Sequence, residues 1–237
     1  MGAGGAAGPP TTLDAVILGI DTSLGTSVAV VDPDGVVYAE ASSANPLGHA
    51  EVIGTLLQSA LADAARGPVG TTTALAPVAV THVAAGMGPG PFTGLRVGVA
   101  AARAFALGRG IPVVPVVSHD AAALAVLLVD PFADVPRFAV VTDARRREFA
   151  YSVYDGIDDD GLPVRSAGPA LAPRDEVDAV LAGLGAERRD ASAIPAAMVA
   201  LAAARAVAAG RVEPLVEPLY LRAPDVTVPA GPKRVGT

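Results

Sequence analysis

The feature that most constrains the fold of this chain is a pattern of segments that occurs twice. In each half, an apolar strand ends in an aspartate, and a turn, a second strand, another turn, a third strand and later a helix follow it. The two leading strands cover residues 16–21 and 138–143 and end in Asp21 and Asp143. A unit repeated in this way indicates an internal duplication. We therefore predict two similar α/β domains with a cleft between them.

The segments were assigned from apolar periodicity, β-branched content and the turn residues between them. Pro112 and Pro115 place one predicted strand near a sheet edge or bend it. The predicted strands cover residues 16–21, 27–31, 36–41, 78–85, 111–117, 138–143, 148–155 and 162–170, and the predicted helices cover 49–65, 95–109, 120–129, 174–182 and 192–209. The predicted domains are a disordered tail (1–12), an N-terminal lobe (13–117), a C-terminal lobe (118–222) and a loose tail (223–237).

A loop rich in glycine and proline joins the strand at 78–85 to the next helix. Proline fixes φ whereas glycine can adopt positive φ, so the loop is predicted to be stiff and sharply bent. Thr93 is predicted to be the N-cap of the helix. A loop of this kind can present backbone N–H groups to a phosphate, but no partner residues for a phosphate converge on it, so we interpret it as a rigid bracket. Its assigned residues are Gly88, Pro89, Gly90, Phe92 and Thr93.

The helix after this loop carries a stripe of very small residues. Gly94, Gly98, Ala102 and Ala106 recur every four positions and share one helix face. A glycine inside a helix costs about 1 kcal/mol relative to alanine, so Gly98 indicates a close approach by another group. Three interpretations are open: plain core packing, a partner interface, or close approach by a ligand.

Composition excludes several classes of protein. The chain of 237 residues has no cysteine, which excludes disulfides and thiolate chemistry. Its net charge of −7 argues against bulk electrostatic attraction to a polyanion, although a local arginine cluster could still bind one. No apolar run reaches the roughly 18–20 residues that a membrane span needs, and the N-terminus lacks the pattern of a secretory signal. We expect a cytoplasmic protein without membrane contact.

The two aspartate corners are the candidate nucleotide site. In two-lobed duplications of the actin type, such corners face the cleft and contact a metal-bound nucleotide. Asp21, Thr22 and Ser23 could serve in this way, whereas the corner at Asp143 has no glycine that would let a phosphate approach the backbone. We therefore predict a vestigial nucleotide corner formed by these four residues, with a functional ATP site as the alternative.

The other chemically active side chains form no recognisable site. His49, His82 and His119 are isolated, and position 53 is Ile, so no His-x-x-x-His pair can bind a metal on the first helix. We predict no metal site and no catalytic residue. The turn at 145–147 consists of three arginines and is interpreted either as a solvated turn or as a contact to RNA or phosphate.

Four blocks of the sequence resemble the TsaB (YeaZ) family. They cover residues 17–23, 88–98, 143–145 and 217–222, and the second block, GPGPFTGLRVG, is the most specific. The high Ala and Arg content resembles that of actinobacterial proteins. The resemblance implies a two-lobed actin/Hsp70-like (ASKHA) fold. It also implies a role in the machinery that transfers threonylcarbamoyl to the adenosine beside the anticodon of ANN-reading tRNAs.

In that machinery a TsaD-like paralogue performs the transfer and a TsaE-like ATPase joins it. The resemblance therefore implies a non-catalytic dimerisation subunit without a cofactor, which also self-associates as a homodimer and meets tRNA only through the complex. The absent His-x-x-x-His pair fits this role, because TsaD-like proteins use such a pair for metal. The alternative function is an ATP-dependent kinase or ATPase of the actin/sugar-kinase type.

The resemblance also implies the position of the partner interface, on the helices at 49–65 and 93–109. Family members usually carry a further strand between the helices of the second lobe. Residues 184–193 are short and polar here, so we expect that strand to be missing and the second lobe to be shortened. The implied interface residues are His49, Val52, Ile53, Leu56, Leu57, Ala60, Gly94, Arg96, Gly98, Ala102, Arg103 and Ala106.

Overall fold

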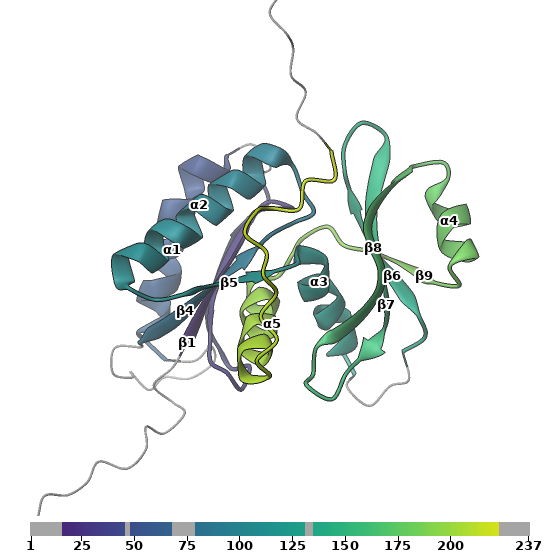
Figure 1. Cartoon of the computed structure of the whole chain (residues 1–237). Helices are drawn as coiled ribbons and strands as arrows, with labels where there is room; N and C mark the ends of the chain where they lie inside the picture. Colours follow the sequence, from purple (N-terminus) through teal and green to yellow (C-terminus); the bar gives the residue numbers. More distant parts are fainter. Residues whose placement is uncertain (1–15, 46–47, 68–78, 131–134, 223–237) are drawn as a thin grey trace, which may run out of the picture.

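A computed structural model describes residues 16–45, 48–67, 79–130 and 135–222. The predicted tails at 1–12 and 223–237 lie outside the described residues. Within the described ranges, none of the helices combines the length and the apolar character needed to cross a membrane. The described residues form two sheets and five helices, arranged in alternating helical and sheet layers (Figure 1).

The first sheet has five strands in the order β3-β2-β1-β4-β5. β1 pairs antiparallel with β2 and parallel with β4, so the meander at the start of the chain lies beside a parallel half. The helices α1 (His49–Ala64) and α2 (Phe92–Arg109) cover one face of this sheet. The strands are β1 (Val16–Asp21), β2 (Thr26–Val31), β3 (Val37–Ser43), β4 (Val80–Gly86) and β5 (Val113–Val116).

The second sheet has four strands in the order β8-β7-β6-β9. Its leading strand β6 (Phe138–Asp143) repeats the position of β1, which confirms the predicted duplication. The helix α4 (Val177–Gly183) packs on its outer face. The other strands are β7 (Glu148–Ile157), β8 (Pro163–Pro173) and β9 (Glu187–Asp190). The predicted two-lobed actin/Hsp70-like class is therefore confirmed.

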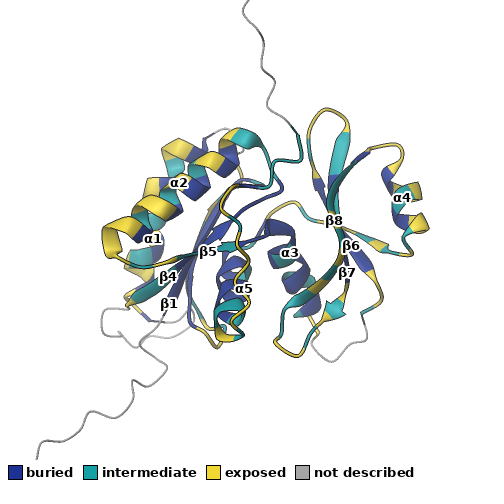
Figure 2. Ribbon diagram, in the orientation of Figure 1, coloured by how far each residue is buried: buried dark blue, intermediate teal, exposed yellow. Residues whose placement is uncertain are grey.

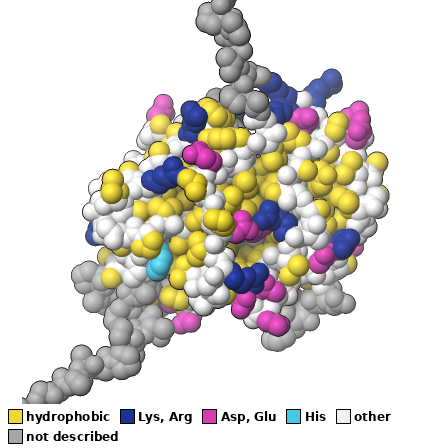
Figure 3. All heavy atoms as spheres, in the orientation of Figure 1, with side chains coloured by type: hydrophobic (Ala, Val, Ile, Leu, Met, Phe, Trp, Pro, Cys, Tyr) yellow, Lys and Arg dark blue, Asp and Glu magenta, His cyan; other side chains and the backbone are white. Residues whose placement is uncertain are grey.

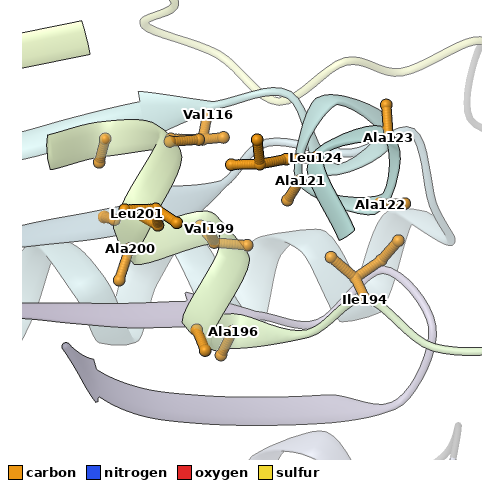
Figure 4. Packing of buried hydrophobic residues seen from close by; sticks show 14 of the residues in the cluster. Val116, Ala121, Ala122, Ala123, Leu124, Ile194, Ala196, Val199, Ala200 and Leu201 are labelled. Atoms are coloured by element: carbon orange, nitrogen blue, oxygen red, sulfur yellow. The ribbon is translucent and has the colours of Figure 1, made fainter. Parts of the chain in front are cut away.

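The layer between the two sheets consists of α3 (Ser118–Leu127) and α5 (Ala196–Ala208). Both helices are rich in alanine, and their buried side chains form one continuous cluster with strands of both sheets (Figure 4). Small side chains let α5 lie directly on β1. A Cβ added to Gly19 would meet the carbonyl oxygen of Ala196 at 2.2 Å, so glycine is required where the helix begins.

This middle layer corrects the predicted domain boundaries. The predicted division at 117/118 falls directly before α3, which packs against the second sheet and α5. The helix α5, however, returns to the first sheet although it was assigned to the C-terminal lobe. The last of the described helices therefore completes the lobe that the first strands begin.

Two further predictions are wrong. The strand expected to be missing is present as β9, which pairs parallel with β6; the second sheet is nevertheless one strand smaller than the first. The helix α2 begins at Phe92 with Pro91 as its N-cap, not with Thr93, and no side chain caps it. The edge position predicted for the proline-containing strand is confirmed, because β5 is the outermost strand of its sheet.

Candidate interlobe site and helix face

The first aspartate corner is enclosed by its own chain. Asp21 is 2% exposed, and one of its carboxylate oxygens accepts hydrogen bonds from the amide and hydroxyl of Ser23, at 2.8 and 2.5 Å. The other oxygen accepts a hydrogen bond from the hydroxyl of Ser118 at 2.6 Å. Burial raises the pKa of Asp21, and the hydrogen bonds from Ser118 and Ser23 oppose that rise. The carboxylate is therefore turned toward protein donors, not toward the cleft.

Ser118 was missed by sequence reasoning. Besides binding Asp21, its hydroxyl accepts a hydrogen bond from the amide of Gly88 at 3.0 Å, and its own amide donates to the carbonyl of Gly88 at 2.8 Å. It therefore ties the glycine-proline loop to the first corner and to the start of α3. In the sequence, Ser118 is a serine that follows an apolar strand and begins a helix. Because this pattern is common, it does not indicate a contact with the first corner.

Thr22 joins the same corner to the small-residue stripe. It is completely buried, and its hydroxyl donates to the carbonyl of Gly94 at 2.8 Å. A Cβ added to Gly98 would lie 2.1 Å from the Thr22 Oγ1. The close approach that the stripe predicted is therefore made by the chain's own first corner, as the core-packing interpretation expected.

The second corner is open and differently arranged. Asp143 is exposed; its carboxylate binds Arg174 at 2.5 Å and accepts from the Arg145 amide at 2.7 Å. The hydrogen bond from Arg174 is the main reason why the pKa of Asp143 is lowered. The three arginines that follow all have positive φ, of 61°, 51° and 65°. Non-glycine residues in this region cost about 1–2 kcal/mol each, so the turn is strained.

A cleft of about 560 Å³ lies between the lobes. The glycine-proline loop forms one wall at residues 89–94, and the second corner forms the other at residues 142–146. Residues 220–222 also line the cleft, together with the buried His49. The first corner does not contribute to the lining, which follows from the enclosed position of Asp21.

The C-terminal segment, residues 211–222, runs between the two lobes and contacts both (Figure 1). On the second lobe, Glu213 pairs with Arg165 at 3.2 Å, and Arg222 pairs with Glu148. On the first lobe, the amide of Leu219 donates to the carbonyl of Met87 at 2.7 Å. The ring of Tyr220 lies on that of Phe92, with centroids 4.8 Å apart. The segment therefore adds contacts between the two lobes, beyond the chain connections that already join them.

The structure divides the implied interface residues into three groups. Seven are buried inside the first lobe: His49, Ile53, Ala60, Gly94, Gly98, Ala102 and Ala106. Val52, Leu56 and Leu57 are half-buried. Arg96 and Arg103 are exposed, but they hold the C-terminal segment: Arg96 Nε donates to the Tyr220 hydroxyl at 3.3 Å, and Arg103 donates to the carbonyl of Val216. The stripe is thus not accessible to a partner, which corrects that part of the expected interface.

The outward face of α1 and α2 is formed by other residues (Figure 2). Leu107 is 85% exposed, and several other exposed positions on the two helices carry small residues. A Cβ added to Gly54 or Gly108 would meet no atom within 4 Å. Small exposed residues at these positions are Gly54, Ala100, Ala104 and Gly108.

The histidines have structural surroundings. His119 is completely buried, and its two ring nitrogens lie 2.9 Å from the hydroxyls of Ser152 and Thr142. Burial lowers the pKa of His119 to about 3, so the ring is neutral. His49 lies 2.9 Å from the Thr26 hydroxyl through its Nδ1. Among the described residues, no group of three or more His, Cys, Asp or Glu is arranged to hold a metal ion.

Comparison with known proteins gives the family. A family model described as TsaD, tRNA N6-adenosine threonylcarbamoyltransferase, matches residues 28–170, which is more than half of the chain. An uncharacterised protein of Mycobacterium tuberculosis is 36% identical over 220 residues, covering 88% of this chain and 92% of that protein. A tRNA N6-adenosine threonylcarbamoyltransferase of Streptococcus pneumoniae is 32% identical over 154 residues, covering 58% of this chain and 43% of that protein.

Solved structures agree at the level of the fold. YeaZ from Pseudomonas aeruginosa has a TM-score of 0.64 and 24% identity, covering 83% of this chain and 93% of that chain. A second Pseudomonas aeruginosa structure, described as an uncharacterised protein similar to peptidase YeaZ, has a TM-score of 0.66 and covers 88% of this chain and 100% of that chain. With the sequence matches and the duplicated fold, these findings show that the chain belongs to the TsaD/YeaZ family, which is linked to threonylcarbamoyl modification of tRNA.

Proposed function

We propose that this chain is the non-catalytic dimerisation subunit of a tRNA threonylcarbamoyltransferase complex. It binds a TsaD-like catalytic paralogue, a TsaE-like ATPase joins the pair, and tRNA is engaged through the assembly. The subunit itself uses no cofactor, and it self-associates as a homodimer through the same helix face.

The observation that carries the proposal is the enclosed first corner. Asp21 accepts three hydrogen bonds from Ser23 and Ser118 of its own chain, so both oxygens of its carboxylate have donors without a metal-bound nucleotide. At the opposite corner, Asp143 is paired with Arg174. These occupied carboxylates support a subunit in which the two-lobed fold serves partner binding and not nucleotide binding.

The outward face of α1 and α2 supports the partner-binding half of the proposal. Exposed glycine and alanine let another backbone approach closely, and the exposed Leu107 adds an apolar contact. We assign the docking surface to this face, which includes Gly54 and Ala100, because the stripe is buried and Thr22 already packs against Gly94 and Gly98.

Co-purification with the TsaD-like paralogue from the same organism tests the proposal. Ala100→Arg places a guanidinium on the docking surface without disturbing the core, because Ala100 is exposed. We expect a loss of binding of roughly 30-fold, since a buried unpaired charge costs at least about 2 kcal/mol. Ala179→Arg, at an exposed position on α4 of the other lobe, is the matched control and retains full binding.

Two results would contradict the proposal. If Ala100→Arg co-purifies with the paralogue as well as the wild type does, α1 and α2 are not the docking surface. If titration calorimetry detects Mg-ATP binding to the isolated chain, and Asp21→Asn weakens it, the alternative kinase or ATPase function is supported instead. We expect no nucleotide binding tighter than about 1 mM.

A further inference from the structure

The C-terminal segment, residues 211–222, is held to the two lobes by different kinds of contact. On the first lobe, the Leu219 amide donates to the Met87 carbonyl and the Tyr220 ring lies on Phe92. Figure 3 shows basic and acidic side chains next to one another in the middle of the face along which the segment runs. On the second lobe, the segment forms ion pairs: Arg211 with Asp158 and Asp160, Glu213 with Arg165, and Arg222 with Glu148. A change of charge can therefore weaken the attachment to the second lobe.

The Arg165 side chain, on β8, lies between two carboxylates. Its Nε is 3.2 Å from the Oδ1 of Asp120 on α3, and its Nη2 is 3.2 Å from the Oε1 of Glu213 on the segment. The side chains of Arg165 and Asp120 are 20% and 19% exposed, whereas that of Glu213 is 48% exposed. Two of the three residues are thus held inside the second lobe and its helix layer, and the third belongs to a segment without helix or strand structure.

Asp120 is the member of this group whose charge changes near neutral pH. Burial raises the pKa of Asp120 to about 6, and the charge of Glu213 adds to the rise. The charge of Arg165 and the hydrogen bond from the Tyr154 hydroxyl, which is 2.7 Å long, oppose it. The Asp120 carboxyl group is therefore mostly neutral below about pH 5 and mostly ionised above about pH 7.

The charges that act on Asp120 are those of Arg165 and Glu213. The elements packed against α3 are α5, β6, β7 and β8. His119, next to Asp120, is neutral because burial lowers its pKa to about 3. The other charged side chains on those elements have partners of their own: Asp143 with Arg174, Glu148 with Arg222, Asp155 with Arg137, and Arg205 with the carbonyl of Gly161.

We propose that Asp120, Arg165 and Glu213 form a pH-sensitive latch that fastens the C-terminal segment to the second lobe. Below about pH 5, Asp120 is neutral and the guanidinium of Arg165 interacts fully with Glu213. Above about pH 7, ionised Asp120 competes for that guanidinium and repels Glu213, so the segment detaches more readily. The sign follows from linkage. Because Glu213 raises the pKa of Asp120, the attached state binds the proton more tightly than the detached state, and protonation favours attachment.

The latch acts on one wall of the interlobe cleft, since residues 220–222 of the same segment line that cleft. Leu219 and Tyr220 keep the segment anchored on the first lobe when Glu213 is released. A rise in pH therefore weakens a connection between the lobes without unfolding either of them. The latch sets how firmly this wall of the cleft is held to the second lobe.

Fluorescence quenching between the segment and β8 tests the latch on the full chain. The sequence contains neither cysteine nor tryptophan, so Val212→Cys, labelled with bimane, and Val164→Trp supply one fluorophore and one quencher. Both positions are exposed, and they flank Glu213 and Arg165. Every protein in the test carries this pair, and thermal melting at each pH checks that it is folded.

We expect the ratio of detached to attached segment to rise roughly fivefold between about pH 5 and about pH 8, since one partly exposed ion pair is worth up to about that factor. Asp120→Asn keeps the segment attached throughout this range. Glu213→Gln is more detached at low pH and does not respond to pH. Glu217→Gln removes the same charge from an exposed position of the same segment; it is the matched control and follows the wild type.

A ratio that stays constant over this pH range in the wild type overturns the inference. It is also overturned if Asp120→Asn or Glu213→Gln retains the wild-type pH response, because the response then arises at another group. Glu213→Gln keeps the test decisive if Asp120→Asn does not fold, since Glu213 is exposed. The isolated chain is measured, so the outcome is independent of binding to the TsaD-like paralogue.

Discussion

Gly98→Ala is the sharpest test of how the first lobe is assembled. A Cβ at this position would lie 2.1 Å from the Oγ1, 3.0 Å from the Cγ2 and 3.1 Å from the Cβ of Thr22. Three atoms of the buried Thr22 side chain block the added Cβ, so rotation of that side chain cannot relieve the contact. Either the first corner or α2 must therefore move. The movement would also break the hydrogen bond from Thr22 to the Gly94 carbonyl, which is 2.8 Å long.

The expected loss follows from three contributions. Overpacking costs about 1–3 kcal/mol, and loss of the buried hydrogen bond costs about 1–3 kcal/mol. The higher helix propensity of alanine returns about 1 kcal/mol. We expect the free energy of unfolding to fall by about 3 kcal/mol, which for a chain of this size lowers the melting temperature by about 6–12 °C.

Gly54→Ala is the matched control, since it makes the same change inside α1 where no atom lies within 4 Å. It should stabilise the protein by about 0.5–1 kcal/mol. Urea denaturation measures both variants, and the penalty of Gly98→Ala should shrink by at least about 1 kcal/mol in a Thr22→Ala background. If Gly98→Ala is as stable as the wild type and instead loses the TsaD-like partner, the stripe is an interface and the packing argument is wrong.

Two further predictions concern the second lobe and the C-terminal segment. Burial raises the pKa of Asp120 to about 6, although the positive charge of Arg165 opposes this rise. Protonated Asp120 therefore stabilises the folded protein fully below about pH 4, and this stabilisation is lost as the pH rises through 6. Between pH 4 and 7, the free energy of unfolding of Asp120→Asn should therefore rise by up to about 3 kcal/mol relative to that of the wild type. Two proteins whose free energies of unfolding change in parallel with pH would contradict this. Tyr220→Ala removes the ring that lies on Phe92 and should make residues 211–222 roughly tenfold more susceptible to proteolysis, since about 1–2 kcal/mol of contact is lost. Val216→Ala, at a position 70% exposed, is the control, and equal cleavage of the two variants would refute this role of Tyr220.

Much of the fold could be predicted from local patterns. The strand β6 has the predicted bounds, Phe138–Asp143, because a continuous apolar run ending in aspartate marks a strand buried on both faces. The strand β9 was missed because its sequence, Glu-Arg-Arg-Asp, has no apolar residue. It is a strand only because the backbone of β6 offers hydrogen bonds along its open edge.

The candidate site was less predictable, because its contacts join distant parts of the chain. Periodicity identified the small stripe on α2 but not its neighbour, since Thr22 is 72 residues from Gly94. Arg96 and Arg103 were assigned to a partner interface because the family resemblance places that interface on their helix. Their actual partners, near Val216 and Tyr220, are more than 110 residues away and have no local signal.

The position of α5 has a consequence for synthesis of the protein on the ribosome. Among the described residues, Ala196 and the helix that it begins cover the first sheet at Gly19. At about 5–20 residues per second, α5 leaves the ribosome roughly 10–40 s after β1. During that interval the first sheet has an uncovered apolar face, so the N-terminal half of the nascent chain is a natural client for chaperones until the last helix arrives.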